Sequence, residues 1–285
     1  MKITSDWHIH SRNSCDQAAM AIEDLILEAE AKGIKDFGIT DHLFTPHNLP
    51  DLSKSRAEYD QCNPSPRFHF GVEASSVSRW ELDQLAADPH CVPNPAYGIR
   101  SGGPSDTVPA IGIAREELAA LGAEYVVAGT HFPLYVEIER QTVIRDYHRQ
   151  NMFLATHQLV DIVAHPWWWH KHWQNDDGTF TGKPWFDDFR HIPQSMHDEF
   201  AAALVETDTK AEINLGATLL NPHYPDRFKE QYLEYIADLK AKGVQLCTSS
   251  DCHAEHYTVD LEAGAAMLDR IGITEDDLWR LPPRQ

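Results

Sequence analysis

Residues 6–10 read DWHIH, a stretch that overlaps the first of seven short apolar runs with the length of β-strands. The runs are residues 2–7, 36–40, 67–73, 124–129, 160–164, 211–215 and 244–250. Because side chains alternate across a strand, we expect Asp6, His8 and His10 on the face opposite Trp7 and Ile9. An acid and two histidines on one face indicate either a polar strand edge or part of a metal site.

Segments with helical periodicity lie between these runs. The clearest are residues 22–33 and 226–243, each of which ends in a glycine. Weaker ones are residues 113–122, 143–159, 195–208 and 259–272. Strands that alternate with helices predict βαβ units and a parallel sheet. Seven strands in one uniform pattern predict an α/β fold, a closed or nearly closed (β/α) barrel in which residues 1–285 form a single domain.

Two segments interrupt this rhythm and are expected to be loop excursions near the barrel mouth. Residues 88–110 are rich in Pro and Gly, and residues 166–193 hold five of the eight tryptophans. Three of these indoles are consecutive, at positions 167–169. They would either form a lid that stacks on substrate or bury their own rings for stability, since tryptophan buries a large area in either role.

The composition limits the partners that we expect. The chain has 44 acidic against 24 basic side chains, a formal net charge of -20, which disfavours nucleic acid because phosphates need clustered Lys and Arg. No apolar run has the length of a membrane span and no basic-then-apolar leader is visible, so a cytoplasmic location is expected. Five cysteines without a CxxC pair argue against disulfides and thiolate zinc sites. A small-molecule substrate is expected, and a homo-oligomer is left open.

Every predicted strand carries a ligand-type side chain at or just beyond its C-terminal end. They are His8, His10, Asp41, His42, Glu73, His131, His165, Asn214, Asp251 and His253. Barrel enzymes build their active sites at this end of the strands. Histidine nitrogens with carboxylate oxygens, and no thiolates, suit Zn²⁺, Mn²⁺ or Fe²⁺. These ligands are more than one ion can use, and two or three divalent ions are therefore expected. A cluster of divalent ions is suited to hydrolysis of a phosphate ester.

The motifs DWHIH, SCDQA, ITDH, GVE, GTH, AHP, EIN and SSDCH, in this order over residues 6–253, closely resemble the PHP family, named for polymerase and histidinol phosphatase domains. The resemblance implies a distorted (β/α)7 TIM-like barrel with a trinuclear metal site. It implies three ligand groups, which are His8, His10, Glu73 and Asp251; Glu73, His131 and His165; and Asp16, His42 and His253. Asp6 and Asp41 would orient ligand histidines from behind.

The expected function is that of a histidinol-phosphatase-like, metal-dependent phosphoesterase. A metal-activated hydroxide would hydrolyse histidinol phosphate or a similar small phosphomonoester, with catalytic roles for Glu73, Asp251, His253 and Asn214. Stand-alone relatives are expected to carry an arginine soon after the Asn of the sixth strand. Leucines 219 and 220 stand there instead. Substrate contacts are therefore expected from His223, Arg227 and Trp168, with Arg79, Arg140 and Lys183 as further candidate phosphate-binding cations.

Other functions remain open at this stage. An amidohydrolase-like enzyme would also be a barrel that opens with HxH, but such enzymes usually use a strand-end lysine between two metals, and no predicted strand ends in lysine. A phosphodiesterase or nucleotide phosphatase and a non-catalytic metal-binding relic are further alternatives. Release of phosphate rather than of an amine would separate the first two classes.

Overall fold

The computed structural model describes residues 1–16, 18–169 and 184–284. Seven parallel strands follow one another around a sheet, with every neighbouring pair in the same direction. In sheet order they are β1 (Ser5–Ile9), β2 (Asp36–Ile39), β4 (Phe68–Ser75), β7 (Tyr125–Gly129), β8 (Ile162–Ala164), β9 (Lys210–Asn214) and β10 (Leu246–Ser249). Each overlaps a predicted strand, and the predicted α/β barrel is confirmed.

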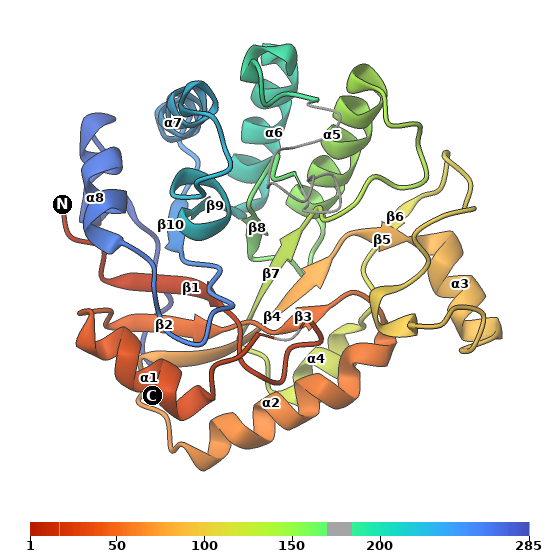
Figure 1. Ribbon diagram of the computed structural model, residues 1–285, viewed down its shortest axis with the longest axis horizontal. Coiled ribbons are helices and arrows are strands. Elements are labelled where there is room, and N and C mark those ends of the chain that lie inside the picture. Colours follow the sequence, from red (N-terminus) through yellow and green to blue (C-terminus); the bar gives the residue numbers. More distant parts are fainter. Residues whose placement is uncertain (17, 170–183, 285) are drawn as a thin grey trace.

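The sheet nearly closes between its first and last strands (Figure 1). An isolated parallel bridge joins Ile9 to Cys252, three residues beyond the end of β10. The backbone N–H of Asp251 donates to the carbonyl of His8 at 2.8 Å, and that of His10 donates to Cys252 at 3.1 Å. Closure therefore brings the ends of the first and last strands together, where both carry ligand-type side chains.

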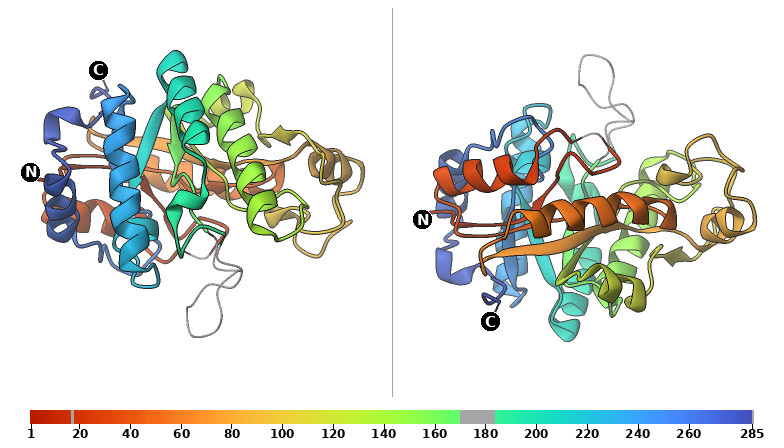
Figure 2. Two further views of the ribbon diagram at one scale, coloured as in Figure 1. Left: turned by 90° about the horizontal axis from the view of Figure 1, so that it is seen from above. Right: turned by 90° about the horizontal axis from the view of Figure 1, so that it is seen from below.

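Helices cover the outside of the strands (Figure 2). Six of them correspond to the predicted helices: α1 (Ile22–Ala31), α4 (Arg115–Leu121), α5 (Arg140–Thr156), α6 (Gln194–Thr207), α7 (Asp226–Ala241) and α8 (Leu261–Arg270). Two more, α2 (Leu49–Gln61) and α3 (Arg79–Ala87), were not predicted. The buried side of α2 consists only of Leu52, Ser55 and Tyr59, so its sequence lacks a clear apolar stripe.

Short elements fill the connections at the carboxyl ends of the strands. They are β3 (His42–Leu43), which pairs with β4; β5 (Val77–Ser78) and β6 (Pro109–Ala110), which pair with each other; the 3-10 turns Pro46–Asn48, Pro95–Tyr97 and Phe189–His191; and the π-helix Leu215–Leu219. A further 3-10 turn, Glu275–Asp277, follows α8 near the amino end of β1, where Glu275 accepts a hydrogen bond from Thr4. Residues 88–110 run from the end of α3 to β6. Of the second expected excursion, residues 170–183 lie outside the described residues.

A small aromatic cluster fills the interior of the barrel. Trp7 packs with Tyr125, Val127 and neighbouring apolar side chains, and the Tyr125 hydroxyl donates to the carbonyl of Trp7 at 2.9 Å. Because β1 and β7 are not adjacent in the sheet, this contact crosses the interior. Two glycines make room for the tyrosine: a Cβ at Gly38 would lie 2.1 Å from its Oη, and one at Gly71 2.6 Å from its Cε1.

The first strand departs from the alternation expected for DWHIH. Its pairing with β2 shifts register between Asp6 and Ile9. Trp7 lies in the interior cluster and the adjacent His8 also faces inward, with its ring nitrogens at Glu73 and Glu212. Asp6 bonds elsewhere, as acceptor from the Tyr257 hydroxyl at 2.6 Å. The prediction that Asp6 and His8 share one face, opposite Trp7, is wrong because the irregularity turns two consecutive side chains inward.

Candidate metal centre

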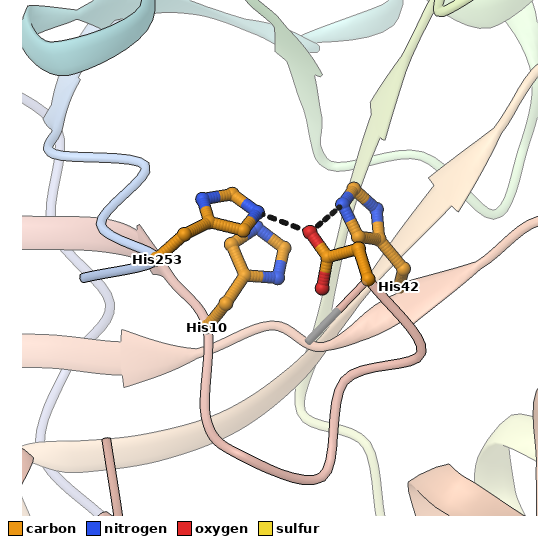
Figure 3. A group of neighbouring side chains, drawn as sticks. His10, His42 and His253 are labelled. Atoms are coloured by element: carbon orange, nitrogen blue, oxygen red, sulfur yellow. Dashed lines mark ion pairs between the residues drawn. The ribbon is translucent and has the colours of Figure 1, made fainter. Parts of the chain in front are cut away.

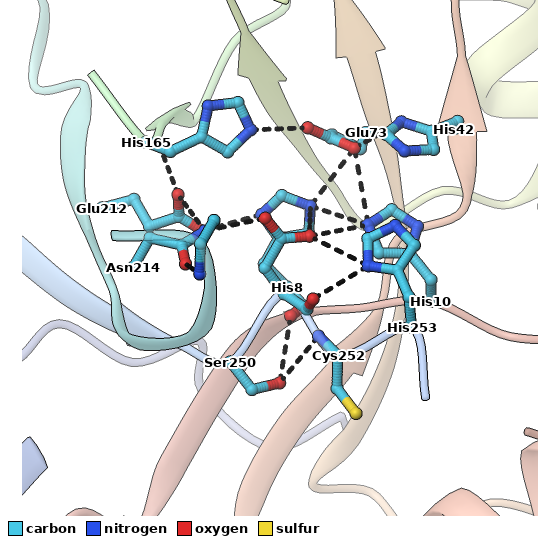
Figure 4. Close-up of polar contacts among 12 residues, drawn as sticks. His8, His10, His42, Glu73, His165, Glu212, Asn214, Ser250, Cys252 and His253 are labelled. Carbon is cyan, nitrogen blue, oxygen red and sulfur yellow. Dashed lines mark hydrogen bonds and ion pairs between the residues drawn. The ribbon is translucent and has the colours of Figure 1, made fainter. Parts of the chain in front are cut away.

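Side chains from the carboxyl ends of the strands converge on one site (Figure 4). Within the described residues, four groups each bring their ligand atoms within 4.8 Å of one another. The groups are His8, His10 and Asp251; His8, Glu73 and His165; His42, Glu73 and His131; and His10, Asp16, His42 and His253. The structure thus brings together all nine residues that the sequence nominated as metal ligands.

Glu73 lies at the centre of these groups, at the end region of β4, and is fully buried. Its Oε1 lies 3.0 Å from His131 Nε2 and 3.2 Å from His165 Nε2. Its Oε2 lies 2.5 Å from His42 Nδ1 and 3.2 Å from His8 Nε2. Since the two oxygens face different histidines, this carboxylate can bridge two cations.

Asp16 closes a second part of the site, in the loop between β1 and α1. Its Oδ2 lies 3.2 Å from His42 Nε2 and 2.6 Å from His253 Nε2. The ring of His10 stacks on those of His253 and His42, with centroids 4.0 and 4.4 Å apart (Figure 3). Chain segments more than 200 residues apart in sequence therefore present nitrogen and oxygen ligands to one small volume.

Two of these ligands sit on unusual backbone. His165 and Asp251 have φ values of 27° and 53°, in the left-handed region that costs a non-glycine residue about 1–3 kcal/mol. Hydrogen bonds hold both in place: the N–H of Asp251 donates to His8, and that of His165 donates to Glu212 Oε2. Asp251 Oδ1 is thereby placed 3.3 Å from His10 Nε2. Such outliers concentrate at functional sites.

Glu212 on β9 is a buried carboxylate that the sequence analysis did not single out. Its Oε1 lies 2.7 Å from His8 Nδ1, and its Oε2 accepts from the backbone of His165 and from Asn214 Nδ2 at 3.1 Å. Asn214 Nδ2 also lies 3.0 Å from Asp251 Oδ2. Glu212 thus fixes one ligand ring and one ligand backbone. The EIN motif contained the signal, because Glu212 is two residues before Asn214 and so shares its face.

Asp6 and Asp41 accept hydrogen bonds from backbone N–H groups rather than from the rings of ligand histidines. Asp6 Oδ1 accepts from the N–H of His8 at 3.2 Å, and Asp41 accepts from the N–H and hydroxyl of Ser11 at 2.6 and 2.7 Å. Neither carboxylate has a hydrogen bond to an imidazole in the described structure. Their contribution is therefore to fix the path of the chain on either side of His10, while Glu212 takes the ring-orienting role that we expected of them.

The electrostatics of the site favour a bound cation. Burial lowers the pKa of His10 to about 3 and that of His131 to about 4, so these rings are neutral and can coordinate. Burial alone would raise the pKa of Glu73, but the adjacent histidines, first His42, hold it well below the usual value. Burial likewise opposes a proton on His42, yet Glu73 raises its pKa to about 10. That proton is a positive charge that a metal ion would replace.

Polar atoms without partners give a separate test of the donor set. Buried polar atoms are normally hydrogen-bonded. Yet Asp16 Oδ1, His10 Nδ1 and His165 Nδ1 are buried without a hydrogen-bond partner in the described structure. The Nε2 atoms of His8 and His10 also face each other at 2.9 Å. Nitrogen and carboxylate donors in this arrangement fit divalent metal ions.

The ligands open into a pocket of about 560 Å³. Its described lining consists of Asp16, His42, Phe44, Tyr97, His131, Phe132, His165, Trp168, Asp251 and His253. A hollow of about 280 Å³ shares Trp168, Asp251 and His253 with it and includes the exposed His223. Trp168 and His223 are thus beside the ligands, as a substrate contact would require.

Three candidate phosphate-binding cations, Arg79, Arg140 and Arg227, lie elsewhere. Arg227 is 60% exposed and pairs with Asp188, and Arg140 pairs with Asp187 at 3.0 Å. Arg79 lines a different pocket, formed with α4 and the end of α5. Lys183, together with the histidines at positions 170 and 172, lies outside the described residues. Within the described parts of the chain, no lysine or arginine lines the pocket at the ligands.

A family model described as PHP domain matches residues 6–246. The chain belongs to the PHP family. The resemblance that the motifs indicated is therefore confirmed, and PHP membership supports a metal-dependent phosphoesterase in general terms. No curated protein matches the sequence. Within the described residues, no helix is both long enough and apolar enough to cross a membrane.

A solved structure shows the same fold. A protein from Listeria monocytogenes, provisionally named as a histidinol phosphatase, is similar with a TM-score of 0.54 and 11% identity, over 88% of this chain and 95% of that chain. At that identity the likeness shows the fold alone. A Xaa-Pro dipeptidase (TM-score 0.42, 11% identity, 95% of this chain and 71% of that one) and an endonuclease IV from Thermus thermophilus (0.32, 13%, 96% and 90%) are less similar in structure.

Proposed function

We propose that this chain hydrolyses a small phosphomonoester with the help of two or three divalent metal ions. The observation that carries the proposal is the convergence of nine histidine and carboxylate ligands around buried Glu73, at the mouth of a barrel whose family supports phosphoester chemistry. Bound ions of this kind lower the pKa of a water molecule and offset the charge of phosphoryl oxygens.

We assign the residues of the site to metal binding and to the orientation of the ligands. His8, His10, Glu73 and Asp251 would hold one ion, Glu73 with His131 and His165 would hold a second, and Asp16 with His42 and His253 would hold a third. Glu212 and Asn214 keep these ligands oriented through hydrogen bonds to His8, to the backbone of His165 and to Asp251. Orientation matters because catalytic geometry must be set before the substrate arrives.

The dimensions of the pocket favour a small substrate. A volume of about 560 Å³ lies within the range of sites for small molecules. Histidinol phosphate is the first compound to test, because the Listeria protein of similar fold has the provisional name of a histidinol phosphatase. Ions in the pocket would also supply the positive charge that a chain of net charge -20 otherwise lacks for binding an anion.

The test is a phosphate-release screen on metal-loaded protein whose metal content is measured in the same preparation. Histidinol phosphate, nucleoside monophosphates and sugar phosphates form the panel, with amide substrates assayed for amine release. Glu73→Gln should lower phosphate release by more than about 100-fold, since loss of a central ligand should exceed the effect of an outer contact. Glu206→Gln, at an exposed position of α6, is the matched control. Undiminished phosphate release by a folded Glu73→Gln protein, or amine release alone, would refute the proposal.

A further inference from the structure

The pocket at the ligands has two unlike walls. One wall is made of the histidines and carboxylates. The other is aromatic, with Phe44 after β3, Tyr97 at the end of the turn Pro95–Tyr97, Phe132 after β7 and Trp168 after β8. The Phe44 centroid lies 5.5 Å from that of Tyr97 and 6.0 Å from that of Phe132. Four connections thus each contribute one ring to the lining of the cavity.

The three consecutive tryptophans differ in environment: Trp168 lines the pocket, and its two neighbours lie in the core. Trp167 and Trp169 are buried, and both pack against Trp185, at centroid distances of 5.5 and 5.3 Å. Trp168 keeps part of its surface exposed and lines the pocket, with its ring 5.1 Å from that of His165. Burial of indoles for stability therefore explains two of the three residues, while the third extends the aromatic wall up to the ligands.

Arg100 lies next to this wall but is bound to other groups of the protein. The guanidinium of Arg100 lies 4.3 Å from the centroid of the Phe132 ring and 3.4 Å from Glu81, and it donates to the carbonyl of Tyr97. Arg100 is not among the residues that line the pocket. The Tyr97 hydroxyl is also occupied, because it donates to the carbonyl of Cys15 at 2.9 Å. The hydrogen-bonding groups of Arg100 and Tyr97 are therefore already engaged by the protein and are not offered to a hydroxyl-rich substrate.

We propose that this pocket selects phosphate esters whose alcohol part carries an uncharged aromatic ring. The inference rests on the proposed function and specifies its substrate class. The phosphoryl group would face the ligands and the ring would pack on the aromatic wall, where burial of apolar area and ring stacking stabilise it. A polyol in the same place would lose hydrogen bonds to water without regaining them.

The reaction itself is ordinary hydrolysis. The oxygen of a water molecule bonds to phosphorus, the bond from phosphorus to the alcohol oxygen breaks, and that oxygen takes up a proton. No oxidant or further reactant is needed. Selection by the wall acts on the alcohol part alone, so it changes which ester reacts and leaves the bonds made and broken the same.

Three esters test the inference on metal-loaded, full-length protein: benzyl phosphate, cyclohexylmethyl phosphate and glycerol 1-phosphate. All are esters of primary alcohols, so differences in leaving-group acidity are small compared with those among aryl esters. Each ring contact is expected to add roughly 2- to 12-fold, the factor that corresponds to an aromatic pair. We expect kcat/KM for benzyl phosphate to exceed that for glycerol 1-phosphate by at least about 10-fold, with cyclohexylmethyl phosphate in between.

Single substitutions then show which rings cause the preference for the benzyl ester. Phe132→Leu and Trp168→Leu keep an apolar side chain but remove a ring, so each should lower the ratio of benzyl to glycerol kcat/KM by roughly 2- to 12-fold. The half-exposed position of Trp168 makes its substitution the safer one for folding. Phe153→Leu removes a ring on α5 that lies outside the pocket lining and should leave the ratio unchanged.

The outcomes distinguish this inference from the function on which it rests. Equal kcat/KM values for the three esters within about 2-fold would overturn the inference while phosphate release itself upheld the function. Equal values for the benzyl and cyclohexylmethyl esters would replace an aromatic preference by a merely apolar one and would also overturn it. Absence of phosphate release from every ester, including those of the function screen, would refute the proposed function.

Discussion

Glu212→Gln is the sharpest single perturbation of the metal centre, because it changes one buried atom and keeps the shape of the side chain. Both carboxylate oxygens now accept hydrogen bonds: Oε1 from His8 Nδ1, and Oε2 from the backbone of His165 and from Asn214. A glutamine there has one accepting oxygen, so its NH₂ must face at least one of these donors. An unpaired buried donor costs about 1–3 kcal/mol.

That cost should appear in metal binding. Partners behind metal-ligating histidines typically contribute 10- to 100-fold in metal affinity or activity, which matches the hydrogen-bond cost above. We expect Glu212→Gln to raise the free metal concentration at half-maximal occupancy by about 10- to 100-fold. Equilibrium dialysis against buffered Zn²⁺ or Mn²⁺, followed by metal analysis, measures this directly, and phosphate release at each metal concentration gives a second readout.

The matched control is Glu206→Gln, which makes the same chemical change at an exposed position of α6. Its metal-binding curve should coincide with that of the unaltered protein. If Glu212→Gln folds and its binding curve and phosphate release are also unaltered, then the contact to His8 does not support the metal centre and the reasoning is wrong. Restored activity at saturating metal would place the effect in affinity rather than in the chemical step.

Three further perturbations test the fold and the site. Saturation of the metal-free protein at 100 times Kd with Zn²⁺ or Mn²⁺ should raise the free energy of unfolding by about 2.7 kcal/mol per binding event, measured by urea denaturation, and an unchanged midpoint would contradict metal binding. Gly38→Ala should lower that free energy by about 1–3 kcal/mol, because its Cβ would meet the Tyr125 hydroxyl, and Tyr125→Phe in the same chain should recover part of the loss. Burial lowers the pKa of His197 to about 4, so its ring stays neutral in the folded protein down to that pH. The unfolded chain binds a proton there below about pH 6.5, so the free energy of unfolding falls as the pH is lowered from 6.5 to 4. His197→Leu should lessen the loss between pH 7.5 and pH 5 by about 2 kcal/mol in urea denaturation, and equal losses in both proteins would contradict this assignment.

The strands and the ligands could be predicted from the sequence because each depends on short-range pattern. Buried parallel strands are apolar runs a few residues long, and the first polar residues after them must lie at the carboxyl edge of the sheet. Glu73 and His131 were found in this way, since Glu73 ends the run 67–73 and His131 lies two residues after the run 124–129. The barrel followed from the same count, because seven strands of one kind leave little choice of architecture.

The remaining features depend on tertiary contacts that no local pattern records. Helix α2 has a mostly polar sequence, and two of its three buried side chains are a serine and a tyrosine. Hydrophobic periodicity therefore does not detect this helix. The EIN motif places Glu212 on the same face as Asn214, but its contact with His8 depends on the closed barrel. The inward turn of both Trp7 and His8 arises from a shift in pairing that alternation cannot anticipate. Arg227 could not be placed either, because a long side chain near a site in sequence can pair with Asp188 on the surface instead.

A shared ligand couples the binding of one metal ion to the binding of the next. Glu73 belongs to two of the four ligand groups, and its two oxygens face different histidines. The first ion to bind therefore pre-orders side chains that the next ion needs, and by thermodynamic reciprocity the later ions tighten the hold on the first. Uptake should be steep in metal concentration, with few half-filled molecules, so that the protein passes from empty to fully loaded over a narrow range of supply.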